Sequence, residues 1–226
     1  MKAFACSHVG HRRRNNEDMI ALDGWTSRDE SPETPQPLET DWALLGDGMG
    51  GHFHGEVASE LAVSLLAVML PALNKAADLR AMIAAIHDRL HSVMASHDGL
   101  DGMGTTIVGV VWLGRRLIGF NVGDSRLYRF TTEALEQLSI DDSIDHALTQ
   151  CIGGSDHGLP VAHLCEWVAS PGERILLCSD GLTDMLDDKQ IHRVLAARSD
   201  DPAHALVEAA LAAGGHDNVS VVVVDP

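Results

Sequence analysis

The order in which hydrophobic periodicity changes along the chain is the feature that most limits its fold. Two long segments, 56–70 and 77–96, follow each other and place apolar residues at helical spacing. From residue 105 the pattern becomes a series of short β-rich runs separated by turn residues, which predicts antiparallel strands at 105–113, 116–122 and 127–130.

The rest of the chain keeps strands and helices in separate groups. Further strands are predicted at 20–22, 41–45, 174–179 and 219–224, and further helices at 188–197 and 202–213. Segment 27–40 carries three prolines and four acidic residues and is predicted to be a loop. Grouped strands and paired helices favour an α+β fold with antiparallel sheets over a parallel β-α-β fold.

Length and charge narrow the classes of function. The 226 residues, with 45% apolar content, predict one domain spanning 1–226. Sixteen Lys and Arg against 33 Asp and Glu give a net charge of −17, which repels a phosphate backbone, so nucleic acid is not an expected partner.

Cysteine spacing and hydropathy predict the compartment. The four cysteines are widely spaced and form no C-x-x-C pair, which indicates a reducing, cytoplasmic environment. Polar residues and a proline interrupt the longest apolar candidate, 57–73, so no membrane span is expected. The first nine residues are too short and too polar for a signal peptide.

Four aspartates each lie at the boundary of a predicted strand, beside a small or turn-forming residue: Asp47, Asp124, Asp180 and Asp217. Any one of them reads more simply as an ordinary turn residue. If the four strand ends share one rim, however, the carboxylates would repel one another unless cations offset their charge. Ligation by oxygen alone points to Mg²⁺ or Mn²⁺ rather than Zn²⁺.

Six short segments then occur in a recognisable order along nearly the whole chain. They are Gly10-x-x-Arg13-x-Asn15-Asn16-Glu17-Asp18, Asp47-Gly48-Met49-Gly50-Gly51-His52, Met103-Gly104-Thr105-Thr106, Asn121-Val122-Gly123-Asp124-Ser125-Arg126, Ser179-Asp180-Gly181-Leu182 and Asp217-Asn218. Together they resemble the metal-dependent protein phosphatases of type 2C. The resemblance implies a central antiparallel β-sandwich flanked by helix pairs, in α-β-β-α layers, with metals at one end.

The resemblance also implies a ligand set for two or three ions. Asp47 would bridge two metals, and the Gly48 carbonyl would bind the first of them. Asp180 and Asp217 would complete the second site, and Asp124 with Asp180 would hold a third ion, as in bacterial members of the family.

Further roles follow from the same resemblance. Glu17 and Asp18 would hold metal-bound waters, and Arg13 would clamp the phosphate through paired hydrogen bonds from its guanidinium. A water that bridges two cations would attack phosphorus directly, without a covalent enzyme intermediate.

Two departures from the family pattern concern the leaving group and the substrate. Animal members often have a histidine where Met49 stands, so we expect His52 to be the general acid, with His54 or a metal-bound water as alternatives. Segment 141–143 leads almost directly to segment 149–154, so the flap that family members commonly insert between them is nearly absent.

The expected function is hydrolysis of phosphoserine and phosphothreonine on proteins, opposing a bacterial serine/threonine kinase, with type VI secretion control as a candidate setting. We expect the protein to be a monomer. Two alternatives stay open, a phosphatase for small phosphomonoesters and an inactive relative that serves as a binding module. The second is disfavoured because Asp47, Asp180 and Asp217 are all present.

Overall fold

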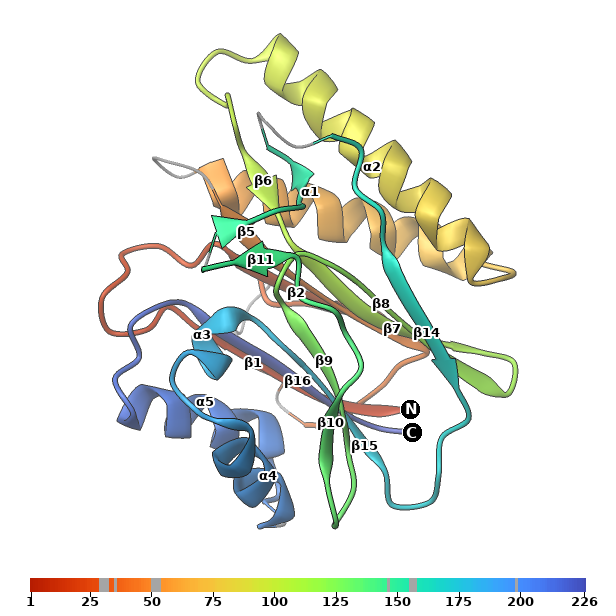
Figure 1. Cartoon of the computed structure of the whole chain (residues 1–226), viewed down its shortest axis with the longest axis vertical. Helices are drawn as coiled ribbons and strands as arrows, with labels where there is room; N and C mark the ends of the chain where they lie inside the picture. Colours follow the sequence, from red (N-terminus) through yellow and green to blue (C-terminus); the bar gives the residue numbers. More distant parts are fainter. Residues whose placement is uncertain (29–32, 35, 50–53, 146, 155–157, 198) are drawn as a thin grey trace.

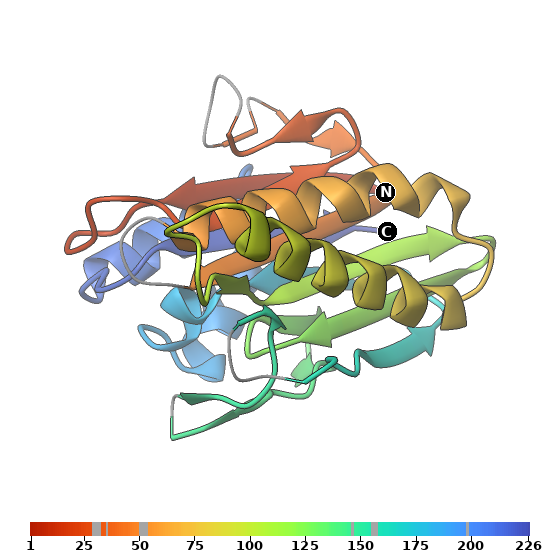
Figure 2. The same cartoon turned by 90° about the horizontal axis from the view of Figure 1, so that it is seen from above.

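Two antiparallel sheets stack face to face, with helices on both outer faces (Figures 1 and 2). This arrangement comes from a computed structural model that describes the chain except residues 29–32, 35, 50–53, 146, 155–157 and 198. Apolar side chains from both sheets, among them Ala5, Leu45, Val110 and Val222, form the central layer of the core. The predicted α+β fold in α-β-β-α layers is confirmed.

One sheet has six strands in the order β10-β9-β15-β16-β1-β4. Its strands are β1 (Lys2–His8), β4 (Leu38–Glu39), β9 (Arg126–Phe130), β10 (Leu135–Gln137), β15 (Arg174–Cys178) and β16 (Val219–Asp225). The first and last strands of the chain pair along their whole lengths. Four consecutive buried valines in β16 fit a central strand that is covered on both faces.

The other sheet has eight strands in the main order β13-β6-β5-β7-β8-β14, and β2 pairs with both β5 and β3. Its strands are β2 (Asp18–Leu22), β3 (Trp25–Thr26), β5 (Trp42–Met49), β6 (Gly104–Thr105), β7 (Ile107–Leu113), β8 (Arg116–Val122), β13 (Ile152–Gly153) and β14 (His163–Trp167). A separate hairpin joins β11 (Ser143–Ile144) to β12 (Ala147–Leu148).

The helices divide between the two outer faces. Helices α1 (His54–Met69) and α2 (Ala77–Ser96), with a 3₁₀ turn η1 (Leu70–Ala72) between them, cover the eight-stranded sheet. Helices α3 (Asp180–Thr183), α4 (Asp188–Ala196) and α5 (Pro202–Ala212) cover the six-stranded sheet. Asp187 and Gln190 form a reciprocal capping box that fixes the start of α4.

Within the described residues, one helical segment, His54–Ala72, is long and apolar enough to pass as a membrane span by length and composition. A single segment of this kind is weak support for a span. Its α-helical part buries Ala58, Ala62 and Leu66 and contacts β2, β5 and α2. We therefore interpret it as a core helix of the layered fold.

Strand β5 corrects one prediction from the sequence. The strand was expected to end at Leu45, with the following glycines forming tight turns, but it continues to Met49. Gly46 and Gly48, which lie within the strand, serve close packing instead: a Cβ on Gly48 would lie 2.1 Å from the carbonyl oxygen of Gly55 in α1. Asp47 therefore projects from a regular strand that is held against a helix, rather than from a turn.

Candidate active site

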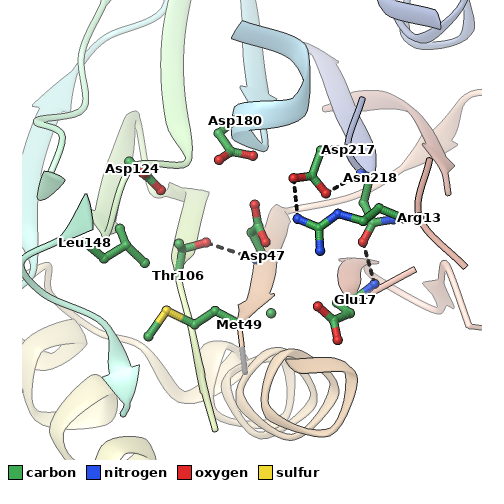
Figure 3. Close-up of a pocket in the computed structure, with 11 residues that line it drawn as sticks. Arg13, Glu17, Asp47, Met49, Thr106, Asp124, Leu148, Asp180, Asp217 and Asn218 are labelled. Carbon is green, nitrogen blue, oxygen red and sulfur yellow. Dashed lines mark hydrogen bonds and ion pairs between the residues drawn. The ribbon is translucent and has the colours of Figure 1, made fainter. Parts of the chain in front are cut away.

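All four aspartates singled out in the sequence line one cleft, of about 330 Å³, at the ends of the strands (Figure 3). The lining residues are Arg13, Glu17, Asp47, Gly48, Met49, Thr106, Asp124, Leu148, Asp180, Asp217 and Asn218. The predicted convergence of strand ends is what the structure shows.

Strand pairing explains why these carboxylates meet. Asp18 in β2 pairs directly with Asp47 in β5. Strands β15 and β16 are neighbours, so Asp180, two residues after β15, lies close to Asp217, two residues before β16. Asp124 occupies the turn between β8 and β9, and β9 pairs with β15. Both sheets therefore contribute carboxylates to the same cleft.

Burial and mutual repulsion dominate the electrostatics of the cleft. Burial raises the pKa of Asp47 well above its usual value, and repulsion from Asp18, Asp180, Asp217 and Asp124 adds to the effect. Burial, followed by the charges of Asp124 and Asp18, raises the pKa of Asp180 to about 7. A cation would offset the repulsion that these shifts reflect.

The environment of Asp18 also fits a bound cation. Its side chain is buried, and its Oδ2 accepts a hydrogen bond from the Ser179 hydroxyl at 2.9 Å. Its Oδ1 is buried with no hydrogen-bond partner among the residues that the structure describes. Burial raises the pKa of Asp18 to about 6. An oxygen-only donor set with an unsatisfied carboxylate oxygen suits Mg²⁺ or Mn²⁺ and their bound waters.

Arg13 and Glu17 reach the cleft from the loop between β1 and β2. The Arg13 guanidinium donates to Asp217 Oδ2 at 2.6 Å, and about half of the arginine side chain is exposed (Figure 3). Burial raises the pKa of Glu17. Its backbone N–H donates to Asn218 Oδ1 at 2.9 Å. The structure thus brings both predicted residues to the cleft from a distant part of the sequence.

Two threonines hold Asp47 in place, a role that the sequence did not reveal. The Asp47 backbone N–H donates to Thr106 Oγ1 at 2.9 Å, and its carbonyl accepts from Thr105 Oγ1 at 2.9 Å. The Thr106 hydroxyl also pairs with Ser125 Oγ at 2.7 Å, beside Asp124. The only sequence signal was the occurrence of both threonines in one of the six segments.

Asn218 was likewise without an assigned role. Its side-chain amide donates to the carbonyls of Val9 and Asn15 at 3.0 and 2.9 Å, and its oxygen accepts from Glu17. The side chain therefore ties the loop that carries Arg13 to the start of β16. It sets where Arg13 and Glu17 stand relative to Asp217.

Buried Asp142 organises the segment next to Asp124. Its Oδ2 accepts from the Gly123 N–H at 3.0 Å, and its Oδ1 lies 2.7 Å from Gln150 Nε2 and 2.8 Å from His163 Nε2. These contacts join the Asp124 turn, the end of the β11–β12 hairpin and β14. Sequence reasoning placed this segment where the flap is shortened and gave Asp142 no role.

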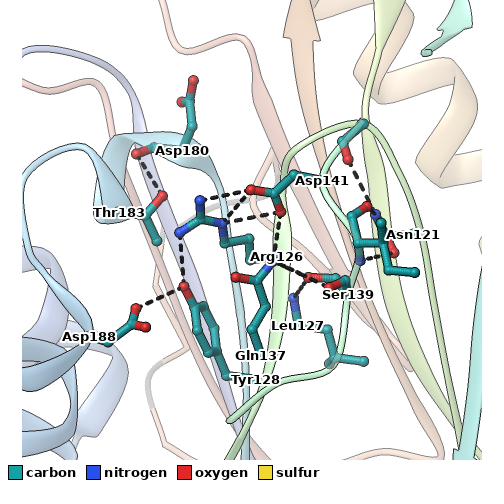
Figure 4. A network of polar contacts seen from close by, with 12 residues as sticks. Asn121, Arg126, Leu127, Tyr128, Gln137, Ser139, Asp141, Asp180, Thr183 and Asp188 are labelled. Atoms are coloured by element: carbon teal, nitrogen blue, oxygen red, sulfur yellow. Dashed lines mark hydrogen bonds and ion pairs between the residues drawn. The ribbon is translucent and has the colours of Figure 1, made fainter. Parts of the chain in front are cut away.

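A second network of polar contacts is centred on Arg126, two residues after Asp124 (Figure 4). Arg126 donates from Nε and Nη2 to Asp141 Oδ2 at 2.9 and 2.7 Å, and from Nη1 to the Tyr128 hydroxyl at 3.1 Å. The same hydroxyl donates to Asp188 at the start of α4. The first residue of β9, directly after the Asp124 turn, is thereby fixed against the helical layer.

The structure leaves the expected general acid unplaced. His52 lies outside the described residues. His54 is the first residue of α1, and no histidine in the described part of the chain lines the cleft. Met49 does line it. The short β11–β12 hairpin occupies the position expected for the flap, and its Leu148 reaches the cleft.

The raised carboxyl pKa values predict a dependence of stability on pH in the absence of metal. Asp18 and Asp180 titrate near 3.8 in the unfolded chain but near 6 and 7 in the fold, so the folded state binds more protons between these values. Their contribution to stability is complete below about pH 4 and is lost as the pH rises towards 7. Thermal melting with a chelator should show this loss.

The substitution Asp180→Asn tests whether the buried carboxyl groups, rather than other titrating groups, cause this pH dependence of stability. Asp180→Asn should raise the melting temperature of the metal-free protein near pH 7.5 and leave it nearly unchanged near pH 4. An equal shift at both pH values would show that repulsion in the cleft is not the cause.

Comparison with known proteins agrees with this geometry. A family model described as "Protein phosphatase 2C" matches residues 34–213. The serine/threonine protein phosphatase PstP of Mycobacterium tuberculosis is 36% identical over 202 residues, which cover 80% of this chain and 39% of that protein. The serine/threonine phosphatase Stp of Listeria monocytogenes is 30% identical over 96% of this chain and 92% of its own.

Solved structures are similar over nearly the whole chain. Mycobacterium tuberculosis PstP/Ppp superposes with a TM-score of 0.83 at 30% identity, covering 99% of this chain and 98% of that one. The PstP catalytic domain in complex with two manganese ions gives 0.81 at 32% identity, with 98% and 96% covered. PppA, a regulatory component of the type VI secretion system in Pseudomonas aeruginosa, gives 0.79 at 29%, with 98% and 95% covered.

The family model covers most of the chain, and the overall fold is shared with solved phosphatases. The chain spans 39% of the length of the mycobacterial relative PstP. By sequence and by fold, this chain belongs to the protein phosphatase 2C family.

Proposed function

We infer that this chain is a metal-dependent phosphatase that hydrolyses phosphoserine and phosphothreonine on proteins. The observation that carries the proposal is the convergence of four carboxylates, Asp47, Asp124, Asp180 and Asp217, in one cleft beside an arginine. Relatives named serine/threonine protein phosphatases support the substrate class.

The ligand roles that we propose are those implied by the family resemblance, and the residues concerned all line the cleft. Asp47 is central and would contact two Mn²⁺ or Mg²⁺ ions, with Gly48 contributing its carbonyl oxygen. Asp180 and Asp217 would complete the second site, and Asp124 with Asp180 a third. Two ions have support from the manganese-containing PstP structure, and the third is our extension.

When bound, such cations offset the phosphate charge and lower the pKa of a water that they share. The protein's own residues would orient the reactants. Glu17 and Asp18 would accept hydrogen bonds from waters at the metals, since Asp18 Oδ1 is a buried acceptor without a partner in the described chain. Arg13 would exchange its contact with Asp217 for two parallel hydrogen bonds to phosphate oxygens.

The leaving serine or threonine oxygen needs a proton from a general acid. We retain His52 as our candidate, with His54 and a metal-bound water as the alternatives. The pH profiles of kcat for His52→Ala and His54→Ala distinguish these candidates. The general acid is the histidine whose removal abolishes the fall of kcat at alkaline pH, and it is a metal-bound water if neither substitution does so.

Turnover of three substrates tests the proposed function directly. Manganese-dependent kcat/KM should be higher for a folded phosphoprotein than for a phosphothreonine peptide or p-nitrophenyl phosphate. A preference for the small ester over both phosphothreonine substrates would favour the alternative of a small-molecule phosphatase. Absence of turnover with all three, despite manganese binding, would favour the inactive binding module.

The wider setting follows from the relatives. We propose a monomeric cytoplasmic enzyme that opposes a bacterial serine/threonine kinase, with no role for nucleic acid or membrane. The similarity to PppA makes type VI secretion control one candidate pathway. Phosphoproteomics of a deletion strain would identify the substrates, and light scattering would measure the oligomeric state.

The position of Arg13 predicts a selective loss of substrate handling. Arg13→Ala should lower kcat/KM roughly 10- to 150-fold. This corresponds to a loss of about 1.5–3 kcal/mol of transition-state stabilisation, the range for a hydrogen bond to a charged group. Arg14→Ala is the matched control, since no contact of this exposed neighbour with the cleft is seen. Equal losses at the two positions would place the phosphate clamp elsewhere.

Asp124 predicts an effect that depends on metal concentration. Asp124→Ala should spare the two-metal core, because Asp47, Asp180 and Asp217 remain, yet it should lower phosphoprotein turnover across a manganese titration. Wild-type kcat/KM would rise a second time at high manganese, and the variant would lack that rise. Identical titrations for the two proteins would remove the third-metal role.

A further inference from the structure

A second cluster of metal-binding side chains lies outside the cleft. Cys6 Sγ, a Glu33 carboxylate oxygen and a His204 ring nitrogen lie within 4.8 Å of one another. The Cys6 side chain points to the outer face of the six-stranded sheet, into the core layer beneath α3–α5. The cluster thus lies on the helix-covered face of the sheet, whereas the acidic cleft lies at the strand ends.

Three separate segments deliver these side chains. Cys6 is in β1 and forms an isolated antiparallel bridge with Glu33. Thr34 reinforces that bridge, since its N–H donates to the Ala5 carbonyl at 3.0 Å and its hydroxyl accepts from the Ala5 N–H at 3.2 Å. His204 is in the first turn of α5, which contacts β1 (Figure 1).

The distances suit a tetrahedral ion after adjustment of the side chains. Glu33 Oε2 lies 3.1 Å from His204 Nδ1 and 4.0 Å from Cys6 Sγ. Zn²⁺ bonds of about 2.0–2.3 Å place neighbouring ligand atoms roughly 3.3–3.6 Å apart. The separation of Cys6 Sγ and Glu33 Oε2 would have to shorten by about half an ångström, and that of Cys6 Sγ and the His204 nitrogen, which is at most 4.8 Å, by up to about 1.3 Å. Glu33 and His204 are each about half exposed, so both can move towards Cys6, which is fixed in the core.

The charges around the thiol also favour a cation. Burial, followed by the carboxylates of Glu33, Asp201 and Glu208, raises the pKa of Cys6 to about 12. Glu208 follows His204 by one helical turn, so it lies on the same side of α5. The Cys6 thiol donates a long hydrogen bond of 4.0 Å to Glu33, so an ion pair between Glu33 and His204 leaves the negative potential at the sulfur only partly offset.

We propose that Cys6, Glu33 and His204 form a binding site for a borderline-soft divalent cation such as Zn²⁺, separate from the catalytic ions. The fourth ligand would be a water or one of the neighbouring carboxylates. The thiol donor sets the selectivity, because thiolate and imidazole suit Zn²⁺ while Mg²⁺ and Mn²⁺ prefer oxygen. On binding, the Cys6 S–H bond breaks, its proton passes to solvent and a sulfur–metal bond forms without any change of oxidation state.

Such an ion would fasten the segment at Glu33 and the start of α5 to β1. Its role would be structural, since it adds a direct link between three segments that meet through the bridge and hydrogen bonds around Glu33, the packing of α5 on β1 and one surface ion pair. Zn²⁺ should therefore raise the melting temperature of the wild-type protein when the acidic cleft is already saturated with Mg²⁺. The rise should be absent in His204→Ala.

Cobalt provides a readout that the acidic cleft cannot give. Co²⁺ bound to a thiolate shows an intense near-ultraviolet charge-transfer band, whereas Co²⁺ bound only to oxygen does not. The full-length protein, kept reduced and with Mg²⁺ in excess, should develop this band with about one equivalent of Co²⁺ and lose it when Zn²⁺ is added. Cys6→Ala should abolish the band.

Matched variants keep the outcome decisive. His204→Ala and Glu33→Gln alter half-exposed side chains, so they should fold normally and weaken Co²⁺ binding about tenfold or more. Cys165→Ala and His97→Ala are the controls and should retain full binding. The proposal fails if wild type shows no band, or if the band survives in Cys6→Ala or in His204→Ala at unchanged affinity. Hydrolysis is not measured, so this result is independent of the proposed function.

Discussion

Asp47→Asn is expected to abolish hydrolysis while leaving a folded protein. Asp47 lies at the centre of the acidic cleft and feels the charge of four other aspartates. Neutralising Asp47 weakens the attraction for both central cations, so kcat/KM should fall at least roughly 10³-fold. This corresponds to a loss of about 4 kcal/mol of transition-state stabilisation. Calorimetry with Mn²⁺ should show that tight binding is lost.

The same substitution should stabilise the protein in the absence of metal. A neutral amide at this position removes a carboxyl group whose charged form is disfavoured by burial and by the four neighbouring aspartates, so the melting temperature with chelator should rise at neutral pH. Asp98→Asn, at an exposed position after α2, is the control and should change neither property. Retained turnover in Asp47→Asn would refute the metal-site assignment.

Gly48→Ala is expected to cause a large loss of stability from the addition of a single methyl group beside the cleft. The new Cβ would lie 2.1 Å from the Gly55 carbonyl oxygen and 2.6 Å from the Glu17 carbonyl oxygen. Both obstacles are backbone atoms, so neither can move without displacing α1 or the loop that carries Arg13. We expect a loss of about 3 kcal/mol or more in the free energy of unfolding.

Urea denaturation of the metal-free protein measures that loss without interference from cation binding. Gly158→Ala is the matched control, because its Cβ would meet no atom of the described residues within 4 Å. Gly48→Ala should also lose manganese binding, since Asp47 shares the displaced strand. A denaturation midpoint equal to that of Gly158→Ala would mean that β5 and α1 are not as closely packed as the structure indicates.

Local sequence signals were sufficient to predict the long helices and the series of antiparallel strands that follows residue 105. Helix α2 has the limits 77–96 that its apolar spacing predicts, and strands at 116–122 and 174–178 closely match their β-rich runs. These segments bury one face or both, so the hydrophobic period alone reveals them. The strand β14 was missed because its residues, HLCEW, are mostly half-exposed at a sheet edge and show no clear alternation.

The identities of individual residues predicted more of the candidate site than of the fold. Asp47, Asp124, Asp180 and Asp217 were recognised because each follows or precedes an apolar run beside a turn-forming residue, and the ordered segments added Arg13, Glu17 and Asp18. The chemistry of a carboxylate is a property of the residue type, so the sequence by itself predicted a site for divalent cations and indicated the family.

Only the tertiary structure decided how those residues are held. Asp142, Thr106 and Asn218 act through contacts across 19 to 209 positions of sequence, which no local pattern encodes. Gly46 and Gly48 read as turn formers from sequence, but the approach of α1 makes them packing positions within a strand. The grouping of Cys6, Glu33 and His204 likewise depends on β1 and α5 lying side by side, because long-range packing sets distances that hydrophobic periods cannot.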